Sequence, residues 1–246
     1  MTAQNNSHFK ITVLTLYPEF FNILHLGVIG KALKKSLWSL EVINIRDFAR
    51  DKYKKVDDKV FGGGRGLLLK ADVLGEAIEF AFNTGSSKNL IYPSPRGTVF
   101  NQTTAKNLLQ QGLTDSAGLT FICGHFEGID ERIIEKYKPQ EISIGDYILS
   151  GGELATAVLV DSILRLHDNV LNSRECAVEE SFKGNLLEYP QYTQPATWAG
   201  MAVPEVLLSG NHQKIKQWRL EKSIEKTKVS RPDLFEKYIK NNQENN

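Results

Sequence analysis

The sequence has only two cysteines among its 246 residues, Cys123 and Cys176, and no Cys-x-x-Cys pair. This spacing gives no support for a disulfide framework or a structural zinc site. Motifs of serine hydrolases, His-Glu-x-x-His metalloproteases and cysteine nucleophiles are also missing. Long hydrophobic runs are missing too: the polar segment Met1–Lys10 does not resemble a signal peptide, and the apolar segment after it is too short to span a bilayer. We therefore expect a cytoplasmic protein that does not contact a membrane.

The sequence also lacks an excess of charge of one sign. It contains 30 Lys and Arg and 29 Asp and Glu, which gives a net charge of +1. Hydrophobic residues make up 41% and charged residues 24%, which is typical of a globular protein. Basic residues gather in two segments: residues 44–65 hold seven Lys and Arg against four Asp, and residues 211–240 hold nine against four acids. Both segments suit contacts with phosphates, and two solvated charged faces explain them equally well.

Short apolar runs alternate with helical patterns over the first two thirds of the chain, which is typical of an α/β domain. We expect strands at residues 10–16, 39–45, 89–93, 119–124 and 140–145, and helices at 27–37, 71–82, 101–111, 128–137 and 154–168. Residues 169–195 have weak periodicity. Helical patterns resume after them, with Ser209 or Asn211 as an N-cap, and a last helix is expected within residues 230–240.

The most glycine-dense stretch is FGGGRGLLLK, residues 61–70. It does not match a phosphate-binding loop, because Leu67 follows Gly66 where Gly-Lys-Ser/Thr is required and because residues 51–60 are not expected to form a strand. It does not match a dinucleotide-binding fingerprint either, since no strand leads into it. A mobile loop that covers a ligand fits this pattern better than a structural turn.

Three predicted strands end in residues that break regular structure: the Pro-Ser-Pro run at residues 93–95, Gly124 and Gly145. In parallel α/β sheets, ligands bind outside the carboxyl ends of the strands. We therefore expect the three loops to form one small-molecule pocket, although each loop alone also fits a structural strand-to-helix turn. The histidines are isolated and are expected to be structural, but His125 lies within one of these loops.

Five motifs stand in the sequence in this order: LYPEFF at 16–21, RDFARDKYKKVDDKVFGGGRGLLL at 46–69, CGHFEGIDERII at 123–134, SIGDYILSGGELA at 143–155 and VPEVLLSGNHQKIKQWR at 203–219. Together they resemble the bacterial tRNA (guanine-N1)-methyltransferase family of the SPOUT superfamily. The resemblance runs from about Lys10 to Tyr238. It implies an enzyme that uses S-adenosyl-L-methionine to methylate N1 of the guanosine at position 37 of tRNA, next to the anticodon.

The resemblance also implies a fold. A SPOUT-type parallel sheet would be threaded as a deep trefoil knot, which general topology rules would exclude because knots are rare. The expected parts are a knotted α/β cofactor-binding domain of residues 1–168, a linker of residues 169–180 and a small, mostly helical tRNA-binding domain of residues 181–246. A homodimer with the active site at the subunit interface is implied too. The two basic segments would then contact the anticodon arm.

The cofactor site carried over by motif consists of three loops that hold S-adenosyl-L-methionine mainly through backbone groups. Its expected residues are Tyr92, Pro93, Ser94, Pro95, Gly124, Glu127, Ile144, Gly145, Asp146, Tyr147, Ile148, Leu149, Gly151 and Gly152. The last two glycines are expected to let the chain turn tightly into the next helix. The resemblance leaves open whether Mg²⁺ is a second cofactor, and no residue is expected as a metal ligand.

The implied reaction transfers a methyl group to a ring nitrogen that carries a proton. The protein must align the two atoms, remove the proton and stabilise the charge that develops on O6. The resemblance implies Arg165 as the cation and an acidic residue after the linker as the base. That residue is an aspartate in the family and Glu180 here, so Glu180 is the expected base and Glu179 its substitute. From spacing alone, the glutamate pair also fits a solvated helix start.

The segment EYPQYTQP, residues 188–195, departs from the family pattern as well. Glu188 replaces an aspartate that is linked to Mg²⁺ in some members, and Gln191 and Gln194 replace a histidine and an arginine. These departures leave one alternative open, a catalytically impaired tRNA-binding protein of the same fold.

Overall fold

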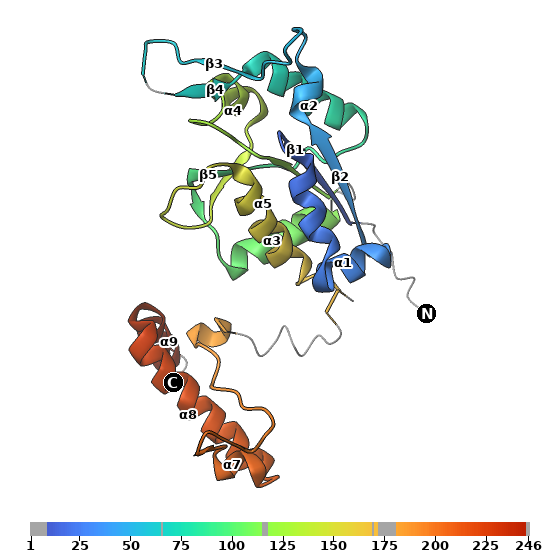
Figure 1. Cartoon of the computed structure of the whole chain (residues 1–246). Coiled ribbons are helices and arrows are strands. Elements are labelled where there is room, and N and C mark those ends of the chain that lie inside the picture. The colour runs from blue at the N-terminus through green and yellow to red at the C-terminus, as the bar shows by residue number, and fades with distance from the viewer. Residues whose placement is uncertain (1–8, 65, 115–117, 169, 172–180, 245–246) are drawn as a thin grey trace. The chain divides into compact units, whose positions relative to one another are not determined.

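The computed structural model describes residues 9–64, 66–114, 118–168, 170–171 and 181–244 (Figure 1). The chain divides into two compact units, Met1–Asn172 and Ser173–Asn246. Glu179, Glu180 and Cys176 lie outside the described residues.

A parallel sheet forms the centre of the first unit. Its strands are β1 (Phe9–Thr15), β2 (Trp38–Asn44), β5 (Leu90–Val99), β6 (Leu119–Ile122) and β7 (Gln140–Ser143). They lie side by side in the order β2-β1-β6-β5-β7, and every neighbouring pair is parallel. The predicted α/β class with a parallel sheet is therefore confirmed, and the carboxyl ends of all five strands lie at one edge.

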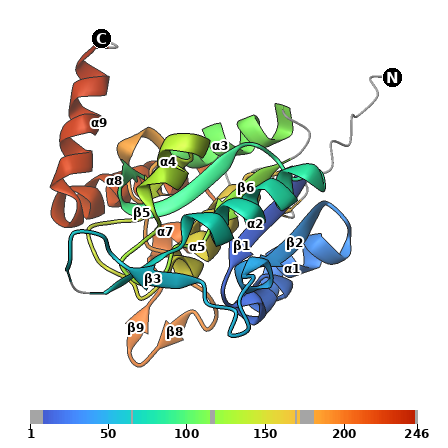
Figure 2. The ribbon, with the colours of Figure 1, turned by 90° about the horizontal axis from the view of Figure 1, so that it is seen from above.

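Helices cover both faces of this sheet. One face carries η1 (Pro18–His25), α1 (Gly27–Lys34), α3 (Gln102–Thr114) and α5 (Gly152–Leu164), and the other carries α2 (Ala71–Asn83) and α4 (Glu131–Tyr137). Figure 2 looks at the sheet from the side of α2 and α4. The short helix η2 (Ile45–Phe48) follows β2 and contacts α2. All five helices predicted in this unit are present, with α5 beginning two residues earlier than expected and ending at Leu164.

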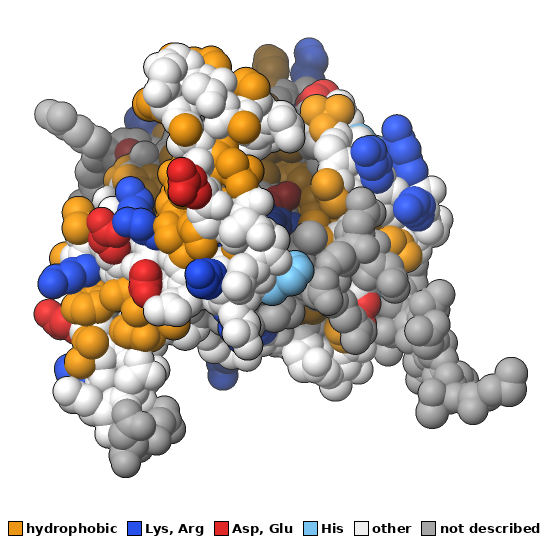
Figure 3. Space-filling model, turned by 90° about the horizontal axis from the view of Figure 1, so that it is seen from below, with side chains coloured by type: hydrophobic (Ala, Val, Ile, Leu, Met, Phe, Trp, Pro, Cys, Tyr) orange, Lys and Arg blue, Asp and Glu red, His pale blue; other side chains and the backbone are white. Residues whose placement is uncertain are grey.

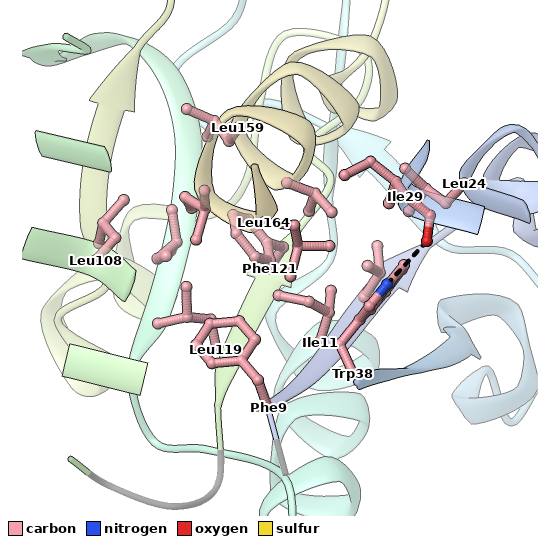
Figure 4. Packing of buried hydrophobic residues seen from close by; sticks show 14 of the residues in the cluster. Phe9, Ile11, Leu24, Ile29, Trp38, Leu108, Leu119, Phe121, Leu159 and Leu164 are labelled. Carbon is pink, nitrogen blue, oxygen red and sulfur yellow. Dashed lines mark hydrogen bonds between the residues drawn. The ribbon is translucent and has the colours of Figure 1, made fainter. Parts of the chain in front are cut away.

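Successive side chains of β1 point to opposite faces of the sheet, and each face has its own hydrophobic core. Phe9, Ile11 and Val13 pack in the core beneath α5, whereas Leu14 packs in the core beneath α2. Burial on both faces is expected for a parallel strand covered by helices. In the first core, shown in Figure 4, the indole nitrogen of Trp38 donates a hydrogen bond of 3.0 Å to the carbonyl of Ile29.

The glycine-rich stretch lies in a hairpin that the sequence did not predict. β3 (Asp57–Lys59) pairs antiparallel with β4 (Leu67–Leu69), so the expectation of no strand within residues 51–60 was wrong. β4 also bonds a distant turn, because the amide of Glu127 donates to the carbonyl of Leu67 and the amide of Leu69 to that of Gly128, each at 3.0 Å. The polar strand β3 is stable as an edge strand because its partner β4 is held in place by the turn at Glu127 and Gly128.

The second unit consists of short elements and two longer helices. They are η3 (Lys183–Asn185), β8 (Thr197–Trp198), β9 (Met201–Ala202), α7 (Glu205–Leu208), α8 (His212–Ser230) and α9 (Pro232–Glu244). The side chain of Asn211 caps α8 by accepting a 3.1 Å hydrogen bond from the amide of Lys214, as predicted. In Figure 3, basic, acidic and hydrophobic side chains are all exposed on the side that is drawn. In the described part of the chain, every helix is too short or too polar to cross a membrane.

Candidate functional site

A pocket of about 300 Å³ lies at the carboxyl ends of β5, β6 and β7. It is lined by residues 92–95, 124–128, 142–145, 147–152 and 155. The three predicted loops therefore share one pocket. Every expected cofactor residue except Asp146 lines it, and Asp146 is an exposed neighbour in the same loop. The role of these residues in cofactor binding stays a prediction.

The first wall comes from β5, which continues to Val99 although its prolines predicted an end at Pro93. Pro93 and Thr98 both pair with Ile142 of β7, so residues 94–97 bulge out of the ladder between them. Gly97 makes this possible, because a Cβ there would lie 2.3 Å from the backbone of Glu141. The bulge turns the Pro-Ser-Pro run towards the pocket rather than along the sheet.

The second wall is the turn after β6. A Cβ on Gly124 would lie 2.7 Å from the ring of Tyr92, which is buried, so only glycine fits against this ring. Burial raises the pKa of the Tyr92 phenol, which therefore keeps its proton as a hydrogen-bond donor. Gly66, the residue before β4, packs closely against the side chain of Glu127: a Cβ at this position would lie 2.2 Å from Cγ of Glu127. The β3–β4 hairpin thus borders the pocket through Glu127.

The third wall is the loop after β7. Gly145 has a φ of 144°, a conformation that favours glycine, and the amide of Tyr147 donates a 3.0 Å hydrogen bond to its carbonyl. The side chains of Tyr147 and Ile148 are 56% and 82% exposed. They form an apolar rim, the kind of surface that marks a ligand or partner site.

The end of this loop is hydrogen-bonded to the second wall, the turn after β6. The amide of Gly152 donates a 2.8 Å hydrogen bond to the carbonyl of Gly124, and His125 forms an isolated bridge with Gly151. Gly151 has extended backbone, with φ −170° and ψ 169°, which any residue adopts. The expectation that the glycine pair supplies conformational freedom is therefore wrong for Gly151. A side chain at this position is excluded instead by the nearby side chains of Glu153 and His125.

Sequence reasoning missed a buried carboxylate beside this pocket. Glu153 is 6% exposed, and its Oε1 accepts a 2.9 Å hydrogen bond from the hydroxyl of Thr15. Its Oε2 lies 3.8 Å from Nε2 of His125, which lines the pocket. In the sequence, Glu153 could be recognised only as an acidic residue at the start of an apolar helix. An acidic residue at that position is equally compatible with a solvent-exposed first turn.

Cys123 lies fully buried under the second wall, with its sulfur 3.3 Å from the hydroxyl of Thr156. Burial raises the pKa of the Cys123 thiol far above neutrality, so the reactive thiolate is not formed. This agrees with the lack of a cysteine nucleophile motif. Among the described residues, no three His, Cys, Asp or Glu side chains gather in a way that could hold a metal ion.

Of the expected catalytic pair, Arg165 is described, and it does not reach the pocket of its own chain. Arg165 follows α5, whose first residue lines the pocket. A helix of 13 residues is about 20 Å long, so Arg165 lies at the far end. Glu180 is outside the described residues.

A parallel α/β sheet whose strand-end loops enclose a pocket, largely with backbone and small residues, defines a protein that binds a small organic ligand. Comparison with known proteins names the family. The family model "tRNA (Guanine-1)-methyltransferase TrmD" matches residues 9–237, so the chain belongs to this family. It is therefore a methyltransferase of tRNA, and the family implies S-adenosyl-L-methionine as the methyl donor.

Individual relatives agree with the family model, and each is named tRNA (guanine-N(1)-)-methyltransferase. The protein of Wolbachia pipientis subsp. Culex pipiens (strain wPip) is 48% identical over 230 residues, covering 92% of this chain and 97% of the relative. The protein of Pelagibacter ubique (strain HTCC1062) is 49% identical over 230 residues, covering 93% and 98%. The protein of Clostridium botulinum (strain Kyoto / Type A2) is 49% identical over 229 residues, covering 93% and 92%.

Proposed function

We propose that this chain binds S-adenosyl-L-methionine in the strand-end pocket and methylates N1 of the guanosine at position 37 of tRNA. The observation that carries the proposal is the convergence on one pocket of the three loops that the resemblance assigns to the cofactor. Its volume of about 300 Å³ is at the lower end of the range for small-ligand sites.

The chemistry of the pocket fits this methyl donor, which combines an aromatic base, a carboxylate and two cationic groups. Tyr147 and Ile148 offer apolar surface to the base, and the carboxylate of Glu127 attracts a cation. Gly124, Gly145 and Gly151 leave backbone groups accessible at the wall. The bound donor supplies an activated methyl group, so the protein has to orient it and exclude water.

A homodimer would complete the site. The exposed face of α5 carries Leu154 and Val158, which are 51% and 46% exposed, and further along it Arg165. The neighbouring η1 adds Ile23, which is 51% exposed. If two copies pack these faces in antiparallel orientation around a twofold axis, the partner's Arg165 lies near the pocket end of α5. This arrangement explains why an expected catalytic cation lies about 15 Å along α5 from Ala155, the last residue of the helix that lines the pocket of its own chain.

In this proposal, Glu180 accepts the N1 proton of the guanine and Arg165 stabilises the negative charge on O6. Glu179 is the substitute base.

The trefoil knot and the division into domains 1–168 and 181–246, with linker 169–180, remain predictions from the family. Whether Mg²⁺ is a second cofactor is left open by the resemblance, and Glu188 stands where some members have the aspartate linked to it. Retention of methylation activity in excess EDTA would contradict an Mg²⁺ requirement.

Contacts with the anticodon arm would come from the two basic segments. In α8, Lys214, Lys216 and Lys226 are exposed and can reach phosphates. Lys52, near the β3–β4 hairpin, is exposed in the same way. Single replacements of these lysines by alanine should weaken tRNA binding and reduce its dependence on salt concentration.

The decisive test is transfer of a labelled methyl group to unmodified tRNA under single-turnover conditions. We expect 1-methylguanosine at position 37, detected by mass spectrometry, and no product when adenosine replaces that guanosine. Binding of tRNA without transfer would instead favour the catalytically impaired alternative. Glu180→Gln should slow transfer by about a hundredfold or more while cofactor affinity is kept. Unchanged transfer in this variant would remove Glu180 from the mechanism.

The shared site can be tested by mixing two inactive variants. Arg165→Ala removes the cation, and Gly124→Val places a side chain against the Tyr92 ring in the pocket. After unfolding and refolding together in equal amounts, about half of the dimers are mixed and each has one intact site, so about a quarter of wild-type activity should return. No recovery in mixed dimers shown to form would contradict a site built from two subunits.

A further inference from the structure

Glu153 is a buried carboxylate, with 6% of its surface exposed. Burying a carboxylate is costly unless it is paired, so its partners are informative. It occupies the second position of α5, where the helix dipole favours negative charge. The hydroxyl of Thr15 donates to one oxygen at 2.9 Å, and Nε2 of His125 lies 3.8 Å from the other.

Gly151 lies between the two members of this pair. A Cβ at position 151 would lie 2.5 Å from Oε2 of Glu153 and 2.6 Å from Nε2 of His125. The backbone of Gly151 is extended and does not itself require glycine. The lack of a side chain is therefore what allows the carboxylate and the imidazole to approach each other across the chain.

The same carboxylate connects three parts of the pocket region. Thr15 ends β1, and its hydroxyl oxygen also accepts a 3.0 Å hydrogen bond from the amide of Tyr17. His125 belongs to the turn after β6, and its ring contacts those of Tyr17 and Phe126 at centroid distances of 5.2 and 5.3 Å. Glu153 begins the helix that follows the third loop. One side chain thus links the sheet, the second wall and the end of the third wall.

We propose that Glu153 is a positioning residue that acts through His125 to hold the second and third walls of the pocket together. The proposal rests on the proposed function, because it concerns the binding of the methyl donor to that pocket. Without the carboxylate, the turn at residues 124–128 separates more readily from Gly151, and the donor binds more weakly. Once the donor is bound the walls are closed, so the transfer step itself changes little.

The test is a double-mutant cycle on the affinity for S-adenosyl-L-methionine, measured by calorimetry on the full chain. Glu153→Gln keeps the size of the side chain and an acceptor for Thr15, and His125→Gln removes the imidazole. Each should raise the dissociation constant about tenfold, and the double variant should be no weaker than either single variant, because both remove the same contact. KM for the donor should rise while kcat under tRNA saturation stays within about threefold.

Asp72→Asn is the matched control. Asp72 is also the second residue of a helix, α2, but its side chain is 66% exposed and lies away from the pocket lining. Its removal should leave donor affinity unchanged. Thermal midpoints without donor identify any variant that is not folded. If Glu153→Gln does not fold, His125→Gln decides, because its imidazole is already partly exposed.

Unchanged donor affinity in folded Glu153→Gln, or in His125→Gln, would overturn the inference. Additive losses in the double variant would overturn it too, since the two side chains would then act independently. A wild-type chain that does not bind the donor at all would contradict the proposed function instead. The two failures are therefore distinguishable in one set of titrations.

Discussion

Gly152→Ala tests how tightly the first turn of α5 packs against the pocket wall. The new Cβ would lie 2.9 Å from both Cα of Cys123 and the amide nitrogen of Gly124. These are backbone atoms at a buried strand end, so they cannot move as a side chain would. Overpacking of this kind costs about 1–3 kcal/mol. Weakening the 2.8 Å hydrogen bond from Gly152 to Gly124 adds about 1 kcal/mol.

We therefore expect Gly152→Ala to lower the free energy of unfolding of the first unit by about 2–4 kcal/mol. For a unit of this size, that corresponds to a drop of about 4–16 °C in the thermal midpoint. The midpoint should be measured by calorimetry without cofactor, because a bound ligand would mask part of the loss. Cofactor affinity should fall as well, since both glycines line the pocket.

Gly75→Ala is the control, because it adds the same methyl group elsewhere in this unit. Gly75 lies within α2, and the nearest atom to its Cβ would be the hydroxyl of Tyr137 at an ordinary 3.5 Å. Alanine in a helix interior should stabilise the unit by about 0.5–1 kcal/mol. A Gly152→Ala variant as stable as wild type, or two variants with shifts of the same sign, would refute the packing argument.

Three further predictions concern stability. Trp38→Phe should lower the free energy of unfolding by about 1–3 kcal/mol in urea titrations, because the hydrogen bond from the indole to the carbonyl of Ile29 is lost and the smaller ring fills less of the core. Asn211→Ala removes the cap of α8 and should destabilise the second unit by about 1 kcal/mol, seen by circular dichroism during urea unfolding. The hydrogen bond from Arg132 holds the pKa of Asp130 below its ordinary 3.8, so its contribution is present above that pH and is lost as pH falls further. Asp130→Asn should flatten the decrease in stability as the pH falls below about 4, measured by acid titration.

The sequence predicted the sheet and the position of the pocket for a simple physical reason. Five apolar runs separated by helical patterns leave a parallel arrangement as the natural solution. Residues that end β5, β6 and β7 then meet at one edge, whatever the order of strands. The convergence of residues 92–95, Gly124 and Gly145 therefore did not require knowledge of the packing.

Features that depend on distant partners were not predictable in this way. Proline and glycine within residues 93–97 indicated the end of a strand, but β7 accommodates the bulge and β5 resumes at Thr98. The charged segment containing β3 had no strand pattern of its own. It forms a strand because β4 is fixed by the backbone of Glu127 and Gly128, about sixty residues further along the chain.

The same limit applies to Glu153, whose partner Thr15 is 138 residues away in the sequence. An isolated acid at a helix start is equally compatible with a solvated turn, and only the fold places it beneath β1. Arg165 is the opposite case: its role was inferred from the motif alone, and the length of α5 then shows that one chain cannot bring it to its own pocket.

Two positions in the loop that links β7 to α5 require glycine for different physical reasons. Gly145 has a positive φ, so any side chain there strains the backbone, whereas Gly151 is extended and is restricted by what surrounds it. The two causes predict different rescues for an alanine substitution. At position 151, removing the His125 ring makes space and should restore part of the lost stability. At position 145, trimming the neighbouring Tyr147 should restore little, because the strain lies in the backbone itself.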